Sequence, residues 1–354
     1  MDTWLTVLIS LLVFGFLIFI HEFGHYVTAR IFKVSITEFS IGMGPKLLWY
    51  DSKKTGIRYS LSMLPIGGYV AMVGENEETD DPNSFDKKPA WQRFIITAAG
   101  AFVNILAGFI AMLVIVGMIR IGGTEVYDFH SDETLTDYGD IDVTYRSSEW
   151  LEKGDVITHV NGKRVVLADE LSYQIMRYGN EPVDLTVIRD GEKIELKDVI
   201  FPVMSEQDQE FGMMDFRVLE KKKTFGNFLS ISFRKAALVM RMCWESIIDL
   251  VRGRYSFAAI SGPVGISEAI GNAAKVGFLS LLNITLLISM NLGFMNLLPI
   301  PALDGGRLLT IIIEMITRKK MPPKVEGVIN SIGLMLLLGL SFVILVKDVF
   351  QIIG

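Results

Sequence analysis

The sequence predicts a polytopic α-helical membrane protein with four transmembrane helices, a β-hairpin region and one inserted water-soluble domain. Three observations support this prediction. Four stretches without charged side chains are long enough to cross a bilayer core, which takes about 20 apolar residues. Glycine and proline divide residues 34–72 into short runs. Residues 120–223 are rich in charge, as expected of a domain that folds in water.

The four predicted spans are distributed along the whole chain. The first runs from Thr3 to about Ala29 and has no charged side chain before residue 21. The other three are residues 94–119, 276–303 and 328–346, and none of them contains a charge. Transfer of such stretches into lipid is favourable, so we expect each to form a helix across the membrane.

Residues 34–72 do not show a helical pattern. Gly42, Gly44 and Pro45 interrupt the first part of this region. The turn-forming sequence Lys-Lys-Thr-Gly at 53–56 then precedes an alternating run at 57–64. Short runs separated by turn residues predict β-hairpins.

The composition excludes several classes of function. Asp and Glu number 40 against 34 Lys and Arg, so the net charge is −6 and we expect no nucleic-acid partner. The single cysteine, Cys243, excludes a disulfide framework or a cysteine zinc site within one chain. Of the four histidines, His130 and His159 lie in the polar middle, whereas His21 and His25 end the first span. A third ligand at a membrane site should therefore be a carboxylate.

The most informative motif is His-Glu-Phe-Gly-His at residues 21–25. On a helix, positions i and i+4 share one face, so His21 and His25 can bind one metal ion together. Glu22 can reach water at that ion as a general base. Ionisable residues are costly in a membrane helix and usually mark a functional site, so the location strengthens the motif.

Lys and Arg near the spans predict the orientation of the chain. They are concentrated between the first two spans and after the third, and cytoplasmic loops carry such an excess. We therefore expect the hairpin region on the cytoplasmic side, and both termini and the soluble domain on the extracytoplasmic side. Residues 221–254 are also basic, but they belong to a long loop, where the rule is weak. Their apolar residues predict either a helix on the membrane surface or one packed against the soluble domain, and the sequence favours neither.

The end of the third span predicts a broken helix and the third ligand. Pro299 and Pro301 remove backbone donors, and Gly305 and Gly306 release the helical constraint. Asp304 lies at this break. Because the first and third spans both run from outside to inside, Asp304 and the two histidines should lie at similar depth. The expected site is His-His-Asp with one open position for water.

These motifs resemble those of the site-2 protease family of intramembrane zinc metalloproteases. Residues 21–25 match the family's zinc motif, and residues 296–305 match its Asn-x-x-Pro-x-x-x-x-Asp-Gly segment. Gly100 and Asn104 look like its Gly-x-x-x-Asn feature, for which we expect a role in helix packing. The resemblance covers nearly the whole chain and is to the bacterial branch with an inserted PDZ domain, of the regulator of sigma-E protease type.

The resemblance implies a zinc ion held by His21, His25 and Asp304, with Glu22 activating a water molecule. It also implies that the hairpin region offers a strand edge to the substrate, and that the Asn-x-x-Pro segment holds the substrate backbone. The substrate-binding residues expected on this basis are Asn296, Pro299 and Gly68.

The inserted domain resembles a single PDZ module, which is an α+β fold. Residues 154–162 read Gly-Asp-Val-Ile-Thr-His-Val-Asn-Gly and look like the PDZ core Gly-Asp-x-Ile-x-x-Val-Asn-Gly. The expected division of the chain is an N-terminal membrane half, a PDZ-like domain, a membrane-surface linker and a C-terminal membrane half, at residues 1–120, 121–220, 221–275 and 276–354.

The resulting prediction is a zinc endopeptidase of the bacterial cytoplasmic membrane. It would cut single-pass membrane proteins, such as anti-sigma factors or signal-peptide remnants, within or near their membrane segment after a first cleavage outside. The PDZ-like domain would filter substrates or bind a peptide tail. An idle membrane scaffold or chaperone is the alternative, but Glu22 is retained. A metal transporter would need ligands at several depths, whereas the candidates here lie at one.

Overall fold

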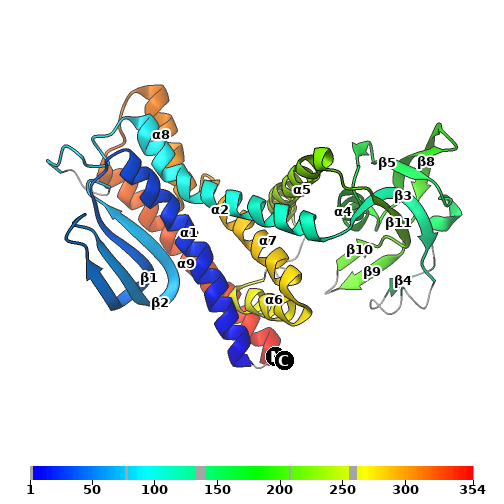
Figure 1. The fold of residues 1–354 in the computed structure, drawn as a ribbon, viewed down its shortest axis with the longest axis horizontal. Helices are drawn as coiled ribbons and strands as arrows, with labels where there is room; N and C mark the ends of the chain where they lie inside the picture. Colours follow the sequence, from blue (N-terminus) through cyan, green and yellow to red (C-terminus); the bar gives the residue numbers. More distant parts are fainter. Residues whose placement is uncertain are drawn as a thin grey trace. The chain divides into compact units, whose positions relative to one another are not determined.

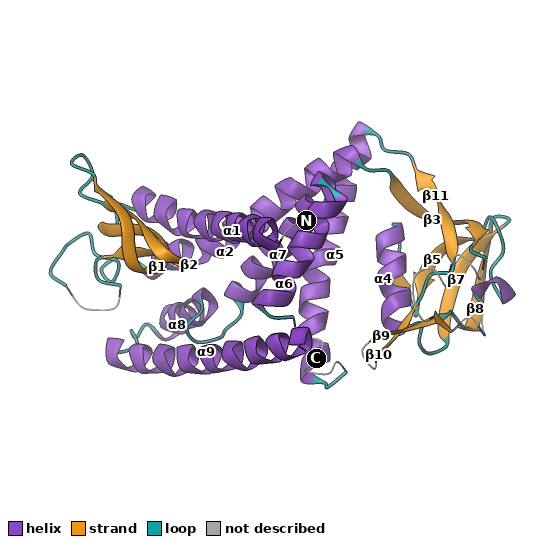
Figure 2. Ribbon diagram, turned by 90° about the horizontal axis from the view of Figure 1, so that it is seen from below, coloured by secondary structure: helices purple, strands orange, loops and turns teal. Residues whose placement is uncertain are grey.

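The computed structural model describes residues 3–75, 79–131, 135, 141–142, 144, 146–206, 209–254 and 261–353. The chain forms two units (Figure 1). The first comprises residues 1–112, 239–245 and 260–354, and the second comprises residues 113–238 and 246–259. Each unit has its own β region (Figure 2), and each is described by itself below.

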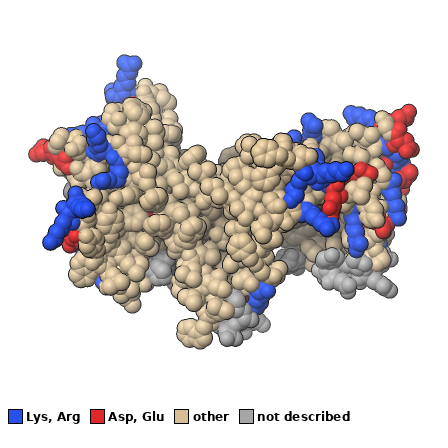
Figure 3. Space-filling view, viewed as in Figure 1, with Lys and Arg blue, Asp and Glu red and all other residues tan. Residues whose placement is uncertain are grey.

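In the part of the chain that the structure describes, four helices are long and apolar enough to cross a membrane, as the sequence predicts. On the face seen in Figure 3, charged side chains are sparse over α1 and α7, as expected of helices in lipid. The four helices are α1 (Thr3–Ile31), α2 (Ala90–Met118), α7 (Phe278–Leu297) and α9 (Pro323–Ile353).

The third span is broken where its two prolines stand. Helix α7 ends at Leu297, and a new helix, α8 (Asp304–Thr317), begins after a connection of six residues. In the connection, Ala302 takes a left-handed conformation with φ 71°. A side chain at Gly305 would collide with the carbonyl group of Leu298, so only glycine lets α8 fold back against the break. The predicted break is confirmed, and it puts Asp304 in the first turn of a helix.

The β-hairpin prediction is also confirmed. Strands β1 (Ile36–Asp51) and β2 (Arg58–Met72) pair antiparallel. The register is more elaborate than one hairpin, because residues 36–41 pair with 68–72 on one side and residues 38–41 pair with 58–61 on the other. Residues 68–72 therefore form an edge, with no second strand beside them among the described residues. The sheet packs on α1 through an aromatic cluster formed by Phe19, Tyr26, Phe39 and Tyr59.

The second unit contains an antiparallel β structure and the helix α4 (Ala168–Tyr178). Its larger sheet has the strand order β11-β3-β5-β7-β8 with β6 beside β5, and a smaller sheet has the order β10-β9-β4. An apolar core of buried residues from the larger sheet and α4 holds this unit together. The elements are β3 (Ile121–Phe129), β4 (Ile141–Asp142), η1 (Ser147–Glu149), β5 (Val156–Val160), β6 (Lys163–Arg164), β7 (Val183–Arg189), β8 (Glu192–Val199), β9 (Val203–Glu206), β10 (Gln209–Gly212) and β11 (Phe216–Lys221).

Two helices, α5 (Phe225–Val251) and α6 (Pro263–Val276), follow the β structure. Ion pairs place part of α5 against the inserted domain, whereas a position of α5 on the membrane surface stays a prediction. One face carries basic residues that form ion pairs with α4, Arg234 with Glu170 and Lys235 with Asp169. The other face is apolar and exposed, at Phe225, Leu229 and Phe233.

Candidate metal centre

The predicted metal-binding motif lies where α1 and α2 are in close contact. Gly24 makes this approach possible, because a Cβ atom there would lie only 2.5 Å from the carbonyl oxygen of Ala99. Gly100 on α2 makes room for the imidazole rings, since a Cβ atom at that position would lie 2.9 Å from Cε1 of His21. The close packing of α1 and α2 at this point therefore requires glycine at both Gly24 and Gly100.

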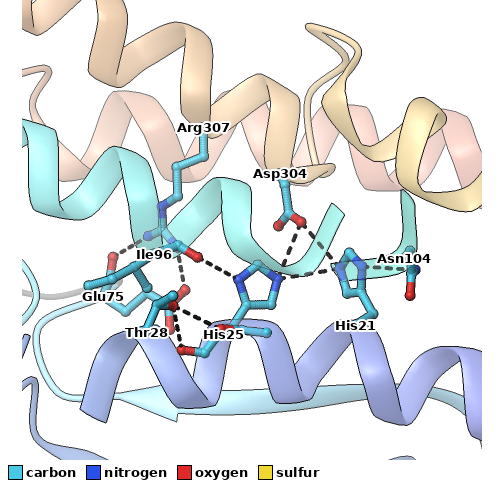
Figure 4. A network of polar contacts seen from close by, with 9 residues as sticks. His21, His25, Thr28, Glu75, Ile96, Asn104, Asp304 and Arg307 are labelled. Atoms are coloured by element: carbon cyan, nitrogen blue, oxygen red, sulfur yellow. Dashed lines mark hydrogen bonds and ion pairs between the residues drawn. The ribbon is translucent and has the colours of Figure 1, made fainter. Parts of the chain in front are cut away.

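His21, His25 and Asp304 meet at one point, as predicted (Figure 4). Nε2 of His21 lies 3.2 Å from Oδ2 of Asp304, and Nε2 of His25 lies 3.3 Å from the same oxygen. The two Nε2 atoms are 3.3 Å apart. The imidazole of His25 is buried, and the side chain of Asp304 is 23% exposed.

This triangle fits zinc. Zinc–nitrogen and zinc–oxygen bonds of about 2.0–2.2 Å in a tetrahedron place neighbouring ligand atoms about 3.3–3.5 Å apart. The three observed separations are 3.2, 3.3 and 3.3 Å. Two neutral imidazoles and one carboxylate form a donor set that zinc accepts at catalytic sites, with the fourth position left for water.

Helix α2 supplies a partner for the distal nitrogen of each histidine. Nδ1 of His25 donates a hydrogen bond of 2.8 Å to the carbonyl oxygen of Ile96, which leaves Nε2 unprotonated and directed at the centre. Nδ1 of His21 lies 3.3 Å from the side-chain nitrogen of Asn104. The sequence suggested only helix packing for Asn104, so its contact with a ligand was missed.

Ion pairs hold α8, and with it Asp304, in place. Arg93 at the start of α2 bonds Glu314 of α8 at 2.5 Å. Arg307, one turn after Asp304, pairs with Glu75 beyond β2. Sequence reasoning did not find this contact, because its partners are 232 residues apart and no local pattern connects them.

A cavity of about 400 Å³ opens beside the three ligands, and Glu22 lines it. The edge segment 68–72 forms another wall of the cavity, and Glu75 and Arg307 also line the cavity. Gly68 packs directly on Glu22, because a Cβ atom on Gly68 would lie 2.9 Å from Cγ of Glu22. The structure therefore brings together the ligands, the predicted base and Gly68.

The other two predicted substrate-binding residues lie apart from this wall. Asn296 is half-buried in the last turn of α7, and Pro299 is exposed in the connection to α8. Neither belongs to the cavity lining in the part of the chain that the structure describes. Their contact with substrate stays a prediction.

Taken together, the fold and the site define a class of protein, a zinc metalloprotease whose metal centre takes two of its three residues from a membrane-spanning helix. Comparison with known proteins gives the family. Residues 9–340 match the model of peptidase family M50, and the chain belongs to that family. Zinc is accordingly its metal, and it is a multi-pass membrane protein.

Several bacterial relatives match this chain along its whole length. A "Putative zinc metalloprotease" of Clostridium acetobutylicum is 34% identical, over 98% of this chain and 98% of its own. Its counterpart in Fusobacterium nucleatum is 32% identical, over 98% of this chain and 99% of its own. Another in Helicobacter pylori is 31% identical, over 98% of this chain and 99% of its own.

Proposed function

We propose that this protein is an intramembrane endopeptidase that hydrolyses peptide bonds of single-pass membrane proteins within or near their membrane segment. The observation that carries the proposal is the placement of the metal centre. Its ligands belong to α1 and to the helix that follows the broken span α7, beside a cavity with a strand edge in its wall. A substrate in the membrane can reach such a site without leaving the bilayer.

Zinc, when bound, polarises the scissile carbonyl group and lowers the pKa of the attacking water. Glu22 lines the cavity beside the ligands and acts as the general base. Its carboxylate takes a proton from the attacking water as the water oxygen bonds to the scissile carbonyl carbon. It then gives that proton to the amide nitrogen as the C–N bond breaks. The products are a carboxylic acid and an amine, between which the second proton of the water is exchanged to leave carboxylate and ammonium, and Glu22 ends the cycle as it began.

A transmembrane helix resists hydrolysis because its backbone carbonyls are already hydrogen-bonded. The substrate must therefore unwind, and its released groups need new partners in an environment with little water. Residues 68–72 line the cavity and have one edge free among the described residues. We propose that the substrate adds to this edge as an extended strand. Asn296 and Pro299 would support the substrate from the end of α7.

The proposed orientation puts the hairpin region and the metal centre toward the cytoplasm and the inserted domain outside. The excess of Lys and Arg in the two predicted cytoplasmic loops supports this orientation. The inserted domain is proposed to be PDZ-like, and its antiparallel sheet with helix α4 is consistent with that. Its proposed role is to exclude substrates until a first protease has removed their bulky outer part.

The test is Glu22→Gln in the full chain, reconstituted with a single-pass model substrate. Removal of a general base should lower the cleavage rate by about 10²–10⁴-fold. Zinc content should not change, because Glu22 is not among the three ligands. Glu192→Gln on the exposed strand β8 is the matched control and should cleave normally. Equal cleavage by Glu22→Gln and wild type would reject this mechanism and favour a scaffold role for the metal.

A further inference from the structure

Asn104 is the most deeply buried polar side chain near the metal centre. It lies on α2 and has no exposed surface. Its carboxamide lies against Nδ1 of His21 at 3.3 Å (Figure 4). Its oxygen, Oδ1, is buried without a hydrogen-bond partner among the residues that the structure describes. A buried carbonyl oxygen without a partner, next to a ring nitrogen that can carry a proton, calls for an explanation.

The chemistry of the imidazole decides which amide atom should face His21. A neutral imidazole carries one proton, and a metal bound at Nε2 requires that proton on Nδ1. An N–H group at Nδ1 needs an acceptor, and within the Asn104 carboxamide only Oδ1 can accept. The nitrogen and oxygen of an amide have nearly the same shape, so exchange of the two brings Oδ1 to this position without moving other atoms.

We propose that Asn104 is a positioning residue for the metal centre, whose Oδ1 accepts a hydrogen bond from Nδ1–H of His21. This bond fixes the tautomer and the ring plane of His21, and so directs the Nε2 lone pair at the metal. The inference rests on the proposed function, in that it assigns a role at the same site. It goes further by naming a residue that holds a ligand and does not itself touch the metal or the substrate.

The two histidines are held in different ways, which makes the proposal testable. His25 donates to the backbone carbonyl of Ile96, a partner that side-chain substitution does not delete. His21 depends on the side chain of Asn104. Ile96, Gly100 and Asn104 are successive residues of one face of α2, each four positions apart. The Gly-x-x-x-Asn pattern thus combines space for both rings at Gly100 with a bond to one of them at Asn104.

If Asn104 served only to pack α2 against α7, loss of its side chain would weaken helix contact and not the hold on His21. Contact with α7 at this level uses the backbone, because the hydroxyl of Ser289 donates to the carbonyl oxygen of Asn104 at 2.8 Å. That bond remains when the side chain of Asn104 is replaced. Ser289→Ala removes it while leaving the carboxamide intact, so this variant is a matched control for loss of packing between α2 and α7.

The test measures zinc affinity of the purified full chain by competition with a chromophoric chelator, without any substrate. Asn104→Leu has a similar shape and no acceptor, and it should weaken zinc binding about 10–100-fold. Asn104→Asp keeps an acceptor and should stay close to wild type, as should Ser289→Ala. The visible absorption of the cobalt-substituted protein should change in Asn104→Leu alone, which a packing role would not produce.

Two outcomes overturn the proposal. One is wild-type zinc affinity in Asn104→Leu. The other is an equal loss of affinity in Asn104→Ala and Asn104→Asp, which decides the matter even if Asn104→Leu fails to fold. Because no substrate is present, these results are independent of proteolysis. Normal zinc binding without cleavage of any membrane substrate would instead reject the proposed function.

Discussion

The contact between Gly68 and Glu22 makes a sharp prediction for Gly68→Ala. The new Cβ atom would lie 2.9 Å from Cγ of Glu22 and 3.0 Å from the carbonyl oxygen of Ser40. Ordinary carbon–carbon contacts are about 3.5–4.0 Å, so the shortfall at Glu22 is about 0.6–1.1 Å. The strand backbone of Ser40 is paired on both sides of its chain and cannot yield easily, so the side chain of Glu22 should move instead.

A displacement of this size matters because Glu22 is the proposed base. Misplacement of a reacting group by about 1 Å can cost about 10² in rate. We therefore expect kcat of Gly68→Ala to fall by about two orders of magnitude. Zinc affinity should be unchanged, since Gly68 does not touch the three ligands that form the centre.

The assay is cleavage of a reconstituted single-pass substrate under saturating conditions, with zinc content measured in the same samples. Gly15→Ala is the matched control, because a Cβ atom at Gly15 on the same helix as Glu22 meets nothing within 4 Å. Wild-type kcat in Gly68→Ala would show that Glu22 is not held by this contact. A loss of zinc in Gly68→Ala would show that the change acts on the ligands, contrary to the reasoning above.

Three further predictions concern the metal and the ion pairs. Dialysis against a strong chelator should abolish cleavage, and zinc should restore it, whereas the same activity without metal would exclude the proposed chemistry. Gly100→Ala should lose zinc in metal analysis, because its Cβ atom would lie 2.8 Å from Cε1 of His25. Asp249→Ala should destabilise the second unit by about 3–5 kcal/mol in denaturant unfolding, because it leaves Arg177 buried without its 2.8 Å partner. The exposed pair of Glu220 is the control, and Glu220→Ala should unfold like wild type.

Features that depend on local sequence could be predicted well. The four spans follow from uncharged stretches, because lipid rejects charge wherever it occurs in the chain. The break after Leu297 follows from proline and glycine chemistry within a few residues. His21 and His25 share a face because of the helical period. Asp304 could be predicted as the third ligand because the first and third spans run in the same direction, which puts it at the depth of the two histidines.

Features that depend on close approach between distant segments could not be predicted. Asn104 meets His21 across 83 positions, and Arg307 meets Glu75 across 232. The register of β1 and β2 could not be predicted either. Residues 38–41 of β1 pair with two separate segments of β2, and no local pattern shows this. Glycines gave a usable signal, because Gly24 and Gly100 mark the close contact that no polar pattern reveals.

The edge segment 68–72 connects two requirements of the proposed reaction, a correctly placed base and a binding site for unwound substrate backbone. Gly68 at its start touches Glu22, the proposed base, and the backbone that follows lines the same cavity. A substrate strand added to this edge would extend past Glu22 and the metal ligands, so its scissile carbonyl would be presented only after the helix has unwound. The fold would then select for unwound backbone rather than for a particular side chain. A proline substitution in the edge segment after Gly68, which removes a backbone N–H, should accordingly raise KM more than it lowers kcat for a reconstituted substrate.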